Sequence, residues 1–389
     1  MASTLVITND FPPRQGGIET FVHAMVTRMP HDDVVVYTSH EPGDTAYDAT
    51  LPFPVVRDST GMLLPTRRAT RKAIEIARAH GCDRVWFGAA APLALMAPAL
   101  RRSGIRRMVA TTHGHEIWWA RIPGARRMMR RIGDGVDVVT YLGQYTRDRI
   151  EPALGPHARM SRLVPGVDVD VYRPDAESDY DTVTDLRTEL GLQGKRVIVC
   201  VARMVPRKGQ DMLIRALPLI RREVPDAVLL LVGQGSDEAR LRKLARRHTD
   251  DGSVVFAGGK THSETPRYYA AADVFAMPCR TRKAGLEAEG LGIVFLEASA
   301  SGLPVVVGDS GGAPDTVLDG RTGNVVDGTD PAAVAGALTR ILLDTDRAAG
   351  MGTAGRRWVR ESWSWDASAR HLTDLLTPER APVRMPGQE

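Results

Sequence analysis

Cysteine is scarce in this 389-residue sequence, with only Cys82, Cys200 and Cys279 present, far apart from one another. They form neither the paired spacing of a zinc site nor a disulfide framework, which excludes a small disulfide-stapled fold and favours a reducing compartment. Two of them lie in or beside strand-like apolar runs, so we expect those two to be small core residues.

Long apolar runs are also missing. The longest, GAAAPLALMAPAL at 88–100, is about half the length that a membrane-spanning helix needs. The chain opens directly into the strand-like segment TLVITND, without a basic leader, so we expect no signal peptide. These two observations predict a protein that does not span a membrane and leave open whether it lies on one.

Acidic residues are rare in one region. Residues 57–131 hold 16 basic and 4 acidic residues, although the net charge of the whole chain is only +4. A basic region beside near-neutral ones indicates an anionic partner for that region. Only six of the 51 basic residues are lysines, which indicates a GC-rich genome and weakens any argument from the choice of arginine alone.

Short apolar strands alternate with helical patterns along most of the chain. Continuous runs such as DVVVYTS (33–39) are typical of parallel sheets covered on both faces. The pattern restarts after a loose acidic stretch at 173–185, and 331–376 reads as consecutive helices. We therefore predict an α/β protein with two Rossmann-like, doubly wound domains facing across a cleft. The expected parts are an N-terminal domain, a C-terminal domain and a last helix and tail that return to the first domain, over residues 1–168, 169–362 and 363–389.

In such sheets ligands bind beyond the carboxyl ends of the strands, so chemistry is expected in the loops that follow strands. The first strand ends in NDFPPRQGGIETF, where Gly16 and Gly17 let the backbone approach a ligand just before a helix begins. Free amides at a helix N-terminus attract phosphate. A flexible turn that opens a helix explains the same two glycines.

The fifth strand is followed by TTHGHEIWW (111–119). No cluster of metal ligands accompanies His113 and His115, so a pocket role and a structural role remain open for His113. Further along, Asp168 and Asp170 form an Asp-x-Asp pair that could hold a divalent cation. Short acidic residues also suit turns, and here the turn is the favoured interpretation.

The second half of the chain opens with RMVPRKG (203–209), directly after the apolar run VIVCVA. An arginine offers a planar fork of donors and a lysine a mobile charge, so an arginine of this stretch and Lys208 can together neutralise a diphosphate. A solvated turn would have the same composition. Arg207 is interpreted as a solvated loop charge.

The most unusual stretch is EAEGLGIVFLEASASG (287–302), in which Glu289 and Glu297 stand eight residues apart. Between them GLG frees the backbone and IVFLEASA predicts a helix. The amides of Gly292, Ile293 and Val294 would then lie at the start of that helix. This arrangement offers hydrogen-bond donors to a phosphate and carboxylates to sugar hydroxyls.

Taken in order, these stretches resemble the retaining glycosyltransferases of family 4, which have the GT-B fold. The resemblance covers roughly 4–376 and rests on the Gly-Gly loop, HGHE, PGVDVDVYRP, VARMVPRKG, LVGQG, AADVFAMP, SGLPVVVGDSGG and the two glutamates. Within the family the chain looks most like the actinobacterial phosphatidyl-myo-inositol mannosyltransferases, in TNDFPPRQGGIE, VWFGAAAPLALMA and GLEAEGLGIVFLEA.

The resemblance implies transfer of mannose from GDP-mannose to phosphatidylinositol monomannoside, forming the second, α-1,6 linkage of phosphatidylinositol mannoside lipids. It implies no metal or other cofactor. The alternative within the family is another nucleotide sugar with a soluble acceptor. A non-catalytic module that binds nucleic acid or a membrane through its basic face is a third hypothesis. No recognised nucleic-acid motif occurs, so we expect no nucleic-acid partner.

The resemblance also assigns residues to roles. It makes His113, Arg203, Lys208 and Glu289 catalytic, with His113 near the reacting carbon of the mannose and the two cations on the diphosphate. Glu297 would hold the ribose. The whole donor-binding set implied in this way is Gly16, Gly17, Arg203, Lys208, Gly233, Gly235, Lys260, Glu289, Gly292, Ile293, Val294 and Glu297.

Two basic amphipathic segments bear on the acceptor. In RIPGARRMMRRI (121–132) the apolar residues Ala125, Met128, Met129 and Ile132 fall on one side of a helix and four arginines on the other; TRRATRKAIEIARAH (66–80) is similar. Such helices bind anionic membranes, although a helix packed on its own sheet gives the same pattern. We expect a cytoplasmic protein, peripheral on the inner face of the plasma membrane. Its acceptor and membrane residues would be Asn9, Asp10, Arg14, Trp118, Trp119, Arg126, Arg127, Arg130 and Arg131.

Overall fold

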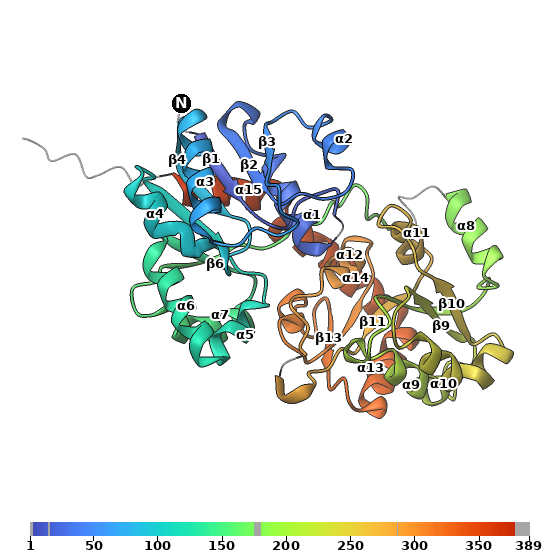
Figure 1. The fold of residues 1–389 in the computed structure, drawn as a ribbon. Helices are drawn as coiled ribbons and strands as arrows, with labels where there is room; N and C mark the ends of the chain where they lie inside the picture. The colour runs from blue at the N-terminus through green and yellow to red at the C-terminus, as the bar shows by residue number, and fades with distance from the viewer. Residues whose placement is uncertain (1–2, 15, 175–179, 286, 378–389) are drawn as a thin grey trace, which may run out of the picture. The chain divides into compact units, whose positions relative to one another are not determined.

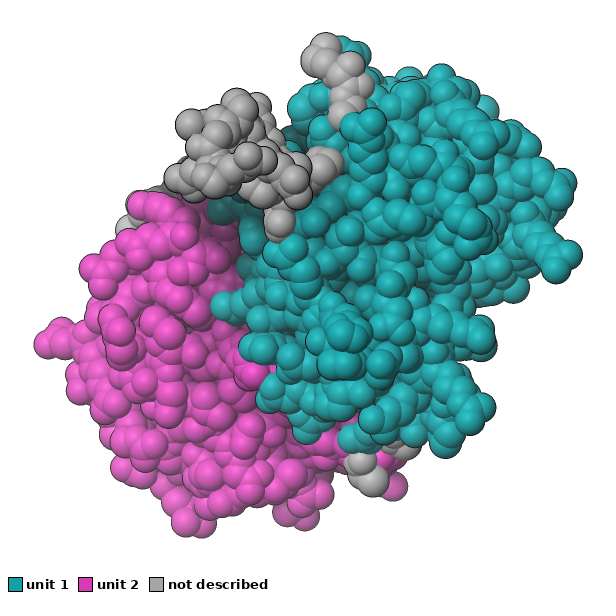
Figure 2. All heavy atoms as spheres, turned by 90° about the vertical axis from the view of Figure 1, so that its left-hand side faces the viewer, with its two compact units in different colours: residues 1–142, 146–164, 365–389 teal, residues 143–145, 165–364 magenta. Residues whose placement is uncertain are grey.

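The computed structural model describes residues 3–14, 16–174, 180–285 and 287–377 (Figure 1). Two compact units make up the chain, and Figure 2 colours them separately. Unit 1 comprises Met1–Leu142, Thr146–Val164 and Trp365–Glu389, and unit 2 comprises Gly143–Tyr145 and Pro165–Ser364. The boundaries expected from the sequence, 168/169 and 362/363, lie a few residues from these.

Unit 1 is built on a seven-stranded sheet in the order β3-β2-β1-β4-β5-β6-β7, with every neighbouring pair parallel. All five residues of β2 are buried, so the strand needs cover on both faces, which a parallel sheet between helix layers provides. The strands are β1 (Ser3–Ile7), β2 (Val34–Thr38), β3 (Val55–Arg57), β4 (Cys82–Phe87), β5 (Arg107–Thr111), β6 (Val138–Tyr141) and β7 (Met160–Arg162).

Helices cover both faces of this sheet. Successive residues of a strand point to opposite faces, so Leu5 and Ile7 join one core and Val6 the other. The first core takes side chains from α3 (Arg67–Ala79), α4 (Ala97–Arg102), α6 (Pro123–Gly135) and α7 (Gln144–Leu154). The second takes them from α1 (Gly17–Val26) and from α15 (Trp365–Leu376), so the last described helix of the chain belongs to unit 1. Two short helices, α2 (Asp44–Asp48) and α5 (Glu116–Arg121), lie in loops that follow strands.

Unit 2 has a six-stranded parallel sheet in the order β10-β9-β8-β11-β12-β13. From β8 the chain builds outward to one side and then returns to add β11 on the other. The junction of β8 with β11 is therefore the switch point at which such sheets bind ligands. The strands are β8 (Arg196–Val201), β9 (Ala227–Val232), β10 (Val254–Gly258), β11 (Val274–Met277), β12 (Val305–Gly308) and β13 (Gly323–Val326).

Helices follow most strands of unit 2. Among them α9 packs with α10 and α13, while α12 packs with α11 and α14. Their bounds, with that of α8, are α8 (Tyr180–Glu189), α9 (Gln210–Ile220), α10 (Glu238–Asp250), α11 (Thr265–Ala270), α12 (Ile293–Ala300), α13 (Pro331–Leu343) and α14 (Thr345–Ser362). The prediction of two doubly wound α/β domains is confirmed. In the part of the chain that the structure describes, no helix has the length and apolarity needed to cross a membrane.

Candidate active site

The loops that follow β8 and β11 meet at the switch point of unit 2. The backbone N–H of Arg280 donates to the carbonyl oxygen of Arg207 at 2.9 Å. Gly209, which ends the loop after β8, has a left-handed φ of 79°, and a Cβ atom there would collide with the carbonyl oxygen of Pro278. The stretch RMVPRKG is therefore packed against its neighbouring loop instead of projecting into solvent.

A buried ion pair lies at this junction. Lys208 Nζ is 2.7 Å from Glu289 Oε2, and the side chain of Lys208 is only 11% exposed. Arg207 Nε lies 3.8 Å from the same oxygen, and its side chain is 25% exposed. The interpretation of Arg207 as a solvated loop charge is therefore wrong, because its partner comes from the loop after β11. Because two cations surround one carboxylate, the cluster keeps a net positive charge at a buried position.

Arg203 is placed differently from Lys208. Its side chain is exposed, and none of the described residues forms an ion pair with it. Its backbone carbonyl oxygen accepts a hydrogen bond of 3.0 Å from the side chain of Gln210. The sequence pairs Arg203 with Lys208, whereas the structure brings Lys208 together with Glu289 and leaves the guanidinium of Arg203 at the surface.

The N-terminus of α12 follows Glu289 directly. Gly292 is its N-cap, with φ 84°, and no side chain caps the helix. Among the described residues, the backbone N–H groups of Gly292, Ile293 and Val294 find no acceptor. First-turn amides have no partner within a helix and attract anions. Unit 2 thus brings the Lys208 cation from one loop to the Glu289 carboxylate of another, just before the free amides of α12. This arrangement suits a sugar bound to a phosphate.

Glu297 lies about one turn further along α12 and is buried. Its Oε2 accepts a hydrogen bond from the Tyr269 hydroxyl at 2.8 Å, and its Oε1 is 3.9 Å from His262 Nδ1. Burial raises the pKa of Glu297, and the bond from Tyr269 offsets part of that rise. The Tyr172 hydroxyl lies 3.2 Å from the same histidine nitrogen. The sequence identified Glu297 but not these aromatic partners, since they come from other segments and belong to no motif.

The three remaining donor candidates have local partners. Side chains at Gly233 or Gly235 would collide with the carbonyl oxygens of Ala202 and Met204, so both glycines let the loop after β9 pack on the loop after β8. Lys260 Nζ lies 5.6 Å from the centre of the Tyr268 ring, a cation–π distance. The contacts of these residues with a nucleotide remain a prediction.

In unit 1, His113 follows β5 at the carboxyl edge of the sheet. Its Nε2 is 2.7 Å from the carbonyl oxygen of Gly88, which only accepts, so this nitrogen carries a proton and donates. The ring meets Phe21 edge-on at 5.2 Å. Burial lowers the pKa of His113, which keeps the imidazole neutral near pH 7. The buried Glu116 carboxylate accepts from the backbone N–H groups of His113 and Gly114, at 3.0 and 3.1 Å.

The loop after β1 holds the other candidates of unit 1. The Asn9 amide forms two hydrogen bonds with the backbone of Leu63, at 2.6 and 3.0 Å, and so pins the loop. Burial raises the pKa of Asp10, and the charge of Glu19 adds to that rise. Glu19 also lies against Gly16, where a Cβ atom would collide with its carboxylate. Arg14 Nε lies 3.1 Å from Glu19 Oε1 and forms an ion pair with this carboxylate.

Gly17, by contrast, has open space around it and begins α1. The carboxylate of Glu19 therefore lies beside the backbone at which the sequence predicts a phosphate. A phosphate contact at Gly16 and Gly17 remains a prediction, and it requires Arg14 or another cation to balance Glu19.

The apolar side of the basic helix α6 is only partly covered. Met129 and Ile132 are buried and Ala125 is half-buried, but Met128 is 41% exposed. The helix therefore packs on its own unit and still presents Met128 to solvent. The arginines predicted to face outward, Arg126, Arg127, Arg130 and Arg131, are all exposed. Of the two tryptophans, Trp118 is 45% exposed, whereas Trp119 packs against the core.

The Asp-x-Asp pair forms a turn. Asp168 Oδ1 accepts the backbone N–H groups of Asp170 and Val171, at 3.0 and 3.3 Å. Among the described residues, no group of three or more His, Cys, Asp and Glu side chains is arranged to hold a metal ion.

Solved structures of other proteins have this same architecture. Two Rossmann-like sheets are the GT-B arrangement, and the chain superimposes on the Anabaena protein Alr3699/HepE in complex with UDP with a TM-score of 0.79, covering 97% of this chain and 99% of that one at 19% identity. It also superimposes on WaaG, a glycosyltransferase involved in lipopolysaccharide biosynthesis, with a TM-score of 0.64 over 96% of this chain and 99% of that one, again at 19% identity. At this identity the likeness shows the fold alone.

The family follows from the sequence comparisons. Residues 15–171 match the model for Glycosyltransferase Family 4, and residues 183–358 match the model for glycosyl transferases group 1. The chain belongs to glycosyltransferase family 4. It is 49% identical, over 97% of its length and 98% of the relative, to the GDP-mannose-dependent alpha-(1-6)-phosphatidylinositol monomannoside mannosyltransferase of Mycolicibacterium smegmatis. It is 47% identical, over 98% of its length and the whole relative, to the protein of the same name from Mycobacterium tuberculosis.

Proposed function

We propose that this chain is a GDP-mannose-dependent α-mannosyltransferase that adds the second, α-1,6-linked mannose to phosphatidylinositol monomannoside, with retention of configuration. The observation that carries the proposal is the Lys208–Glu289 pair, with Nζ and Oε2 2.7 Å apart, just before the uncapped N-terminus of α12. The relatives named for this reaction share 47–49% of their residues with the chain over almost its full length, which supports the choice of donor and acceptor.

The donor half of the reaction needs charge stabilisation. Negative charge grows on the diphosphate as GDP leaves, and fixed donors aimed at that charge lower the barrier. The buried ammonium of Lys208 and the free amides of α12 supply such donors, and Arg203 supplies a further one from an exposed side chain. Lys208 and Glu289 neutralise each other until a diphosphate takes the ammonium and sugar hydroxyls take the carboxylate.

The remaining candidates orient the substrates. Glu297 presents Oε1 to the ribose hydroxyls while Tyr269 holds Oε2. His113 offers a neutral ring to the mannose near the reacting carbon. The acceptor hydroxyl attacks on the face that the phosphate leaves, and a phosphate oxygen takes its proton. The protein then contributes orientation and charge, and neither a protein nucleophile nor a bound metal takes part.

The basic surface of unit 1 supports an anionic lipid partner. Four exposed arginines lie on α6 beside the exposed side chains of Met128 and Trp118, and α3 buries Ala69, Ala73 and Ile76 while its basic side faces outward. Arginines with interleaved apolar side chains suit an anionic membrane surface. This supports a peripheral position on the cytoplasmic face of the plasma membrane, where the lipid acceptor would lie.

The test of the reaction is radiolabel transfer from GDP-mannose to a panel of inositol lipids, with linkage analysis of the product. We expect one labelled product, α-1,6-linked, on phosphatidylinositol monomannoside. Thermal stabilisation by GDP should exceed that by UDP or ADP. Transfer from another nucleotide sugar to a soluble acceptor would contradict the proposal, and the absence of any nucleotide effect would favour a non-catalytic module.

The test of the membrane position is sedimentation with vesicles. Anionic vesicles should carry the protein down and neutral ones should not, and high salt should weaken the binding. Equal binding to both kinds of vesicle would contradict the docking proposal without affecting the proposed reaction.

A further inference from the structure

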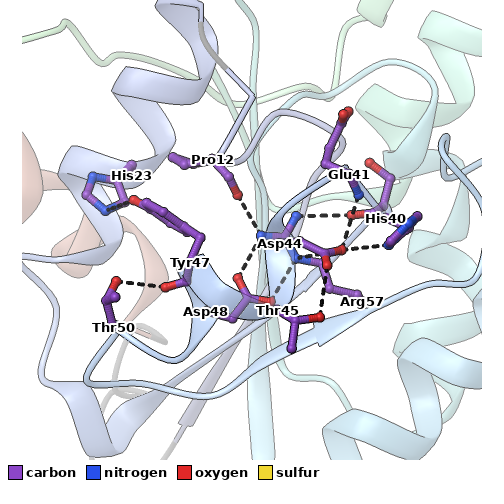
Figure 3. A network of polar contacts seen from close by, with 11 residues as sticks. Pro12, His23, His40, Glu41, Asp44, Thr45, Tyr47, Asp48, Thr50 and Arg57 are labelled. Carbon is purple, nitrogen blue, oxygen red and sulfur yellow. Dashed lines mark hydrogen bonds and ion pairs between the residues drawn. The ribbon is translucent and has the colours of Figure 1, made fainter.

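A second set of buried polar contacts in unit 1 centres on Arg57, the last residue of β3 (Figure 3). Its side chain is 11% exposed. Arg57 Nε and Nη2 donate to the two carboxylate oxygens of Asp48, at 3.0 and 2.7 Å. This two-point pair is the strongest geometry that an arginine and a carboxylate form. Because Asp48 is the last residue of α2, the pair fixes the guanidinium between β3 and that helix.

The same guanidinium reaches two further segments. Nη2 also donates to the carbonyl oxygen of Pro12 at 2.6 Å, and Nη1 donates to that of Ser39 at 3.1 Å. The Phe11 ring lies 5.6 Å from Arg57 Cζ. Arg57 therefore connects α2, the end of β2 and the loop that follows β1. Four of its hydrogen bonds are accounted for, so the side chain has little freedom to move.

The loop that Arg57 holds is the one that carries Asp10 and Arg14. Pro12 lies between those two residues and has no backbone N–H, so its carbonyl group is its only hydrogen-bonding group. Loops are more mobile than the elements they connect unless side chains fix them. The Arg57–Pro12 bond is such a fixation. A weaker link reaches the same loop from Glu41, whose Oε1 is 4.0 Å from Arg14 Nη1.

The neighbourhood of Arg57 is itself rigid. Asp44, at the start of α2, accepts from the Glu41 backbone at 3.2 Å and lies 2.7 Å from His40 Nδ1. At the other end of the helix, the Tyr47 hydroxyl lies 3.0 Å from His23 Nε2 of α1. Helix α2 is thus bonded both to the loop that follows β2 and to α1, and from this helix Asp48 orients Arg57 (Figure 3).

We propose that Arg57 is a positioning residue for the transfer reaction. Held by Asp48, it fixes residues 8–14 of the loop after β1 in the conformation in which Asp10 and Arg14 receive the polar head of the inositol lipid. Arg57 itself touches no substrate. The inference rests on the proposed function, because it names the part of the site that the lipid head uses.

Unit 1 offers a matched control. Arg101 also donates to a carboxylate, with Nη2 2.7 Å from Asp137 Oδ2, and to the carbonyl groups of Ile105 and Arg106. Asp137 lies just before β6 and Arg106 just before β5, so this pair stands at the amino ends of the strands. Arg57 stands at the carboxyl end of β3. Both arginines thus bond one carboxylate and two carbonyl groups, at opposite edges of the sheet. Arg101 is 38% exposed and bonds Asp137 through one nitrogen, whereas Arg57 is 11% exposed and bonds Asp48 through two.

The experiment compares Arg57→Gln with Arg101→Gln in the full chain. For Arg57→Gln we expect kcat/KM for the lipid to fall on the order of ten- to a hundred-fold, because small displacements of positioning groups have effects of that size. Its KM for GDP-mannose should stay within about two-fold of wild type, since unit 2 holds the donor candidates. Hydrogen exchange of the backbone amides within residues 8–14 should speed up in Arg57→Gln only. Arg101→Gln should change neither the kinetics nor the exchange of this loop.

The possible results distinguish a failure of the positioning role from a failure of the proposed reaction. Equal losses for donor and lipid in both variants, or faster exchange with unchanged lipid kinetics, would overturn a positioning role. If wild type transfers no mannose, the proposed function fails, and unchanged exchange in the loop would then also overturn the role of Arg57. If Arg57→Gln does not fold, Asp48→Asn keeps the shape of the partner and should show the same selective loss.

Discussion

The two units share one strand order around their switch points but hold their loops by different means. In unit 2 the loops after β8, β9 and β11 pack backbone on backbone, through Gly209, Gly233 and Gly235. In unit 1 the loop after β1 is held by side chains, through the Asn9 amide on Leu63 and the Arg57 guanidinium on Pro12. Backbone packing leaves one geometry, which would suit the diphosphate that we propose for unit 2. Side-chain links can be changed one at a time, which would suit the lipid acceptor that we propose for unit 1.

The largest effect is expected from breaking the ion pair of unit 2. Lys208→Ala should lower the rate of mannose transfer by about 10²- to 10³-fold, the usual cost of removing a donor aimed at developing charge. It also leaves the Glu289 carboxylate buried with Arg207 alone. Single-turnover transfer from GDP-mannose measures the loss. Lys283→Ala is the control, because that lysine is exposed and pairs with Glu287 in the same unit. Retention of more than a tenth of wild-type activity in Lys208→Ala would contradict the assigned role.

The next prediction compares two glycines. A side chain at one would collide with the backbone of another loop, whereas a side chain at the other would meet open space. Gly233→Ala places a methyl group against the Ala202 carbonyl oxygen at a φ of 136°, so we expect a loss of about 1–3 kcal/mol in the free energy of unfolding. Gly17→Ala meets open space at the start of α1 and should leave stability unchanged or slightly higher. Thermal unfolding of the two variants measures the difference. Equal stability would mean that the loops of unit 2 are not held by their backbone.

These contrasts also show what the sequence could predict. Continuous apolar strands such as Val34–Thr38 predict a parallel sheet because both faces must be covered, and the loops after such strands then mark the site. The glycines and charges of RMVPRKG and of the stretch around Glu289 were recognised in this way. Each rests on local spacing, which a sequence displays directly.

The contacts that were missed are long-range or depend on packing. Arg57 and Pro12 are 45 positions apart, and no periodicity links an arginine at a strand end to a proline carbonyl. Arg207 was misread because its partner, Glu289, comes from another loop. Helical spacing gives the direction of the apolar arc of α6 but not which of its residues are covered, so the exposure of Met128 is known only from the structure. Sequence thus predicts elements and candidate loops, while the side-chain links between loops require the fold.

A smaller effect is expected at Glu297, where one substitution should raise the stability of the fold and weaken nucleotide binding. Burial holds its folded pKa above its ordinary value, so the ionised carboxylate costs stability at neutral pH, and this cost disappears as the pH falls through the ordinary value near 4.5. Glu297→Gln keeps an acceptor for the Tyr269 hydroxyl and removes the charge. It should raise the melting temperature at pH 7 by a few degrees, lose that advantage near pH 4, and weaken GDP binding. Calorimetry at the two pH values measures the first effect and titration with GDP the second. A less stable variant, or unchanged GDP affinity, would contradict the assignment.

The last prediction concerns His113 and tests whether unit 1 contributes a neutral ring. Burial holds its folded pKa below 6.5, so the imidazole is neutral from pH 6.5 upward and gains a proton only at lower pH. The rate of transfer should therefore be independent of this group above pH 6.5 and fall below it. Protonation also disfavours the fold, so stability should fall over the same acidic range. In His113→Asn the acid limb assigned to the ring should vanish from the pH–rate profile, with the activity at pH 7.5 reduced about ten-fold. If wild type instead gains activity as the pH falls through 6, the protonated ring is the working form, and unit 1 contributes a charge where the structure places a neutral donor.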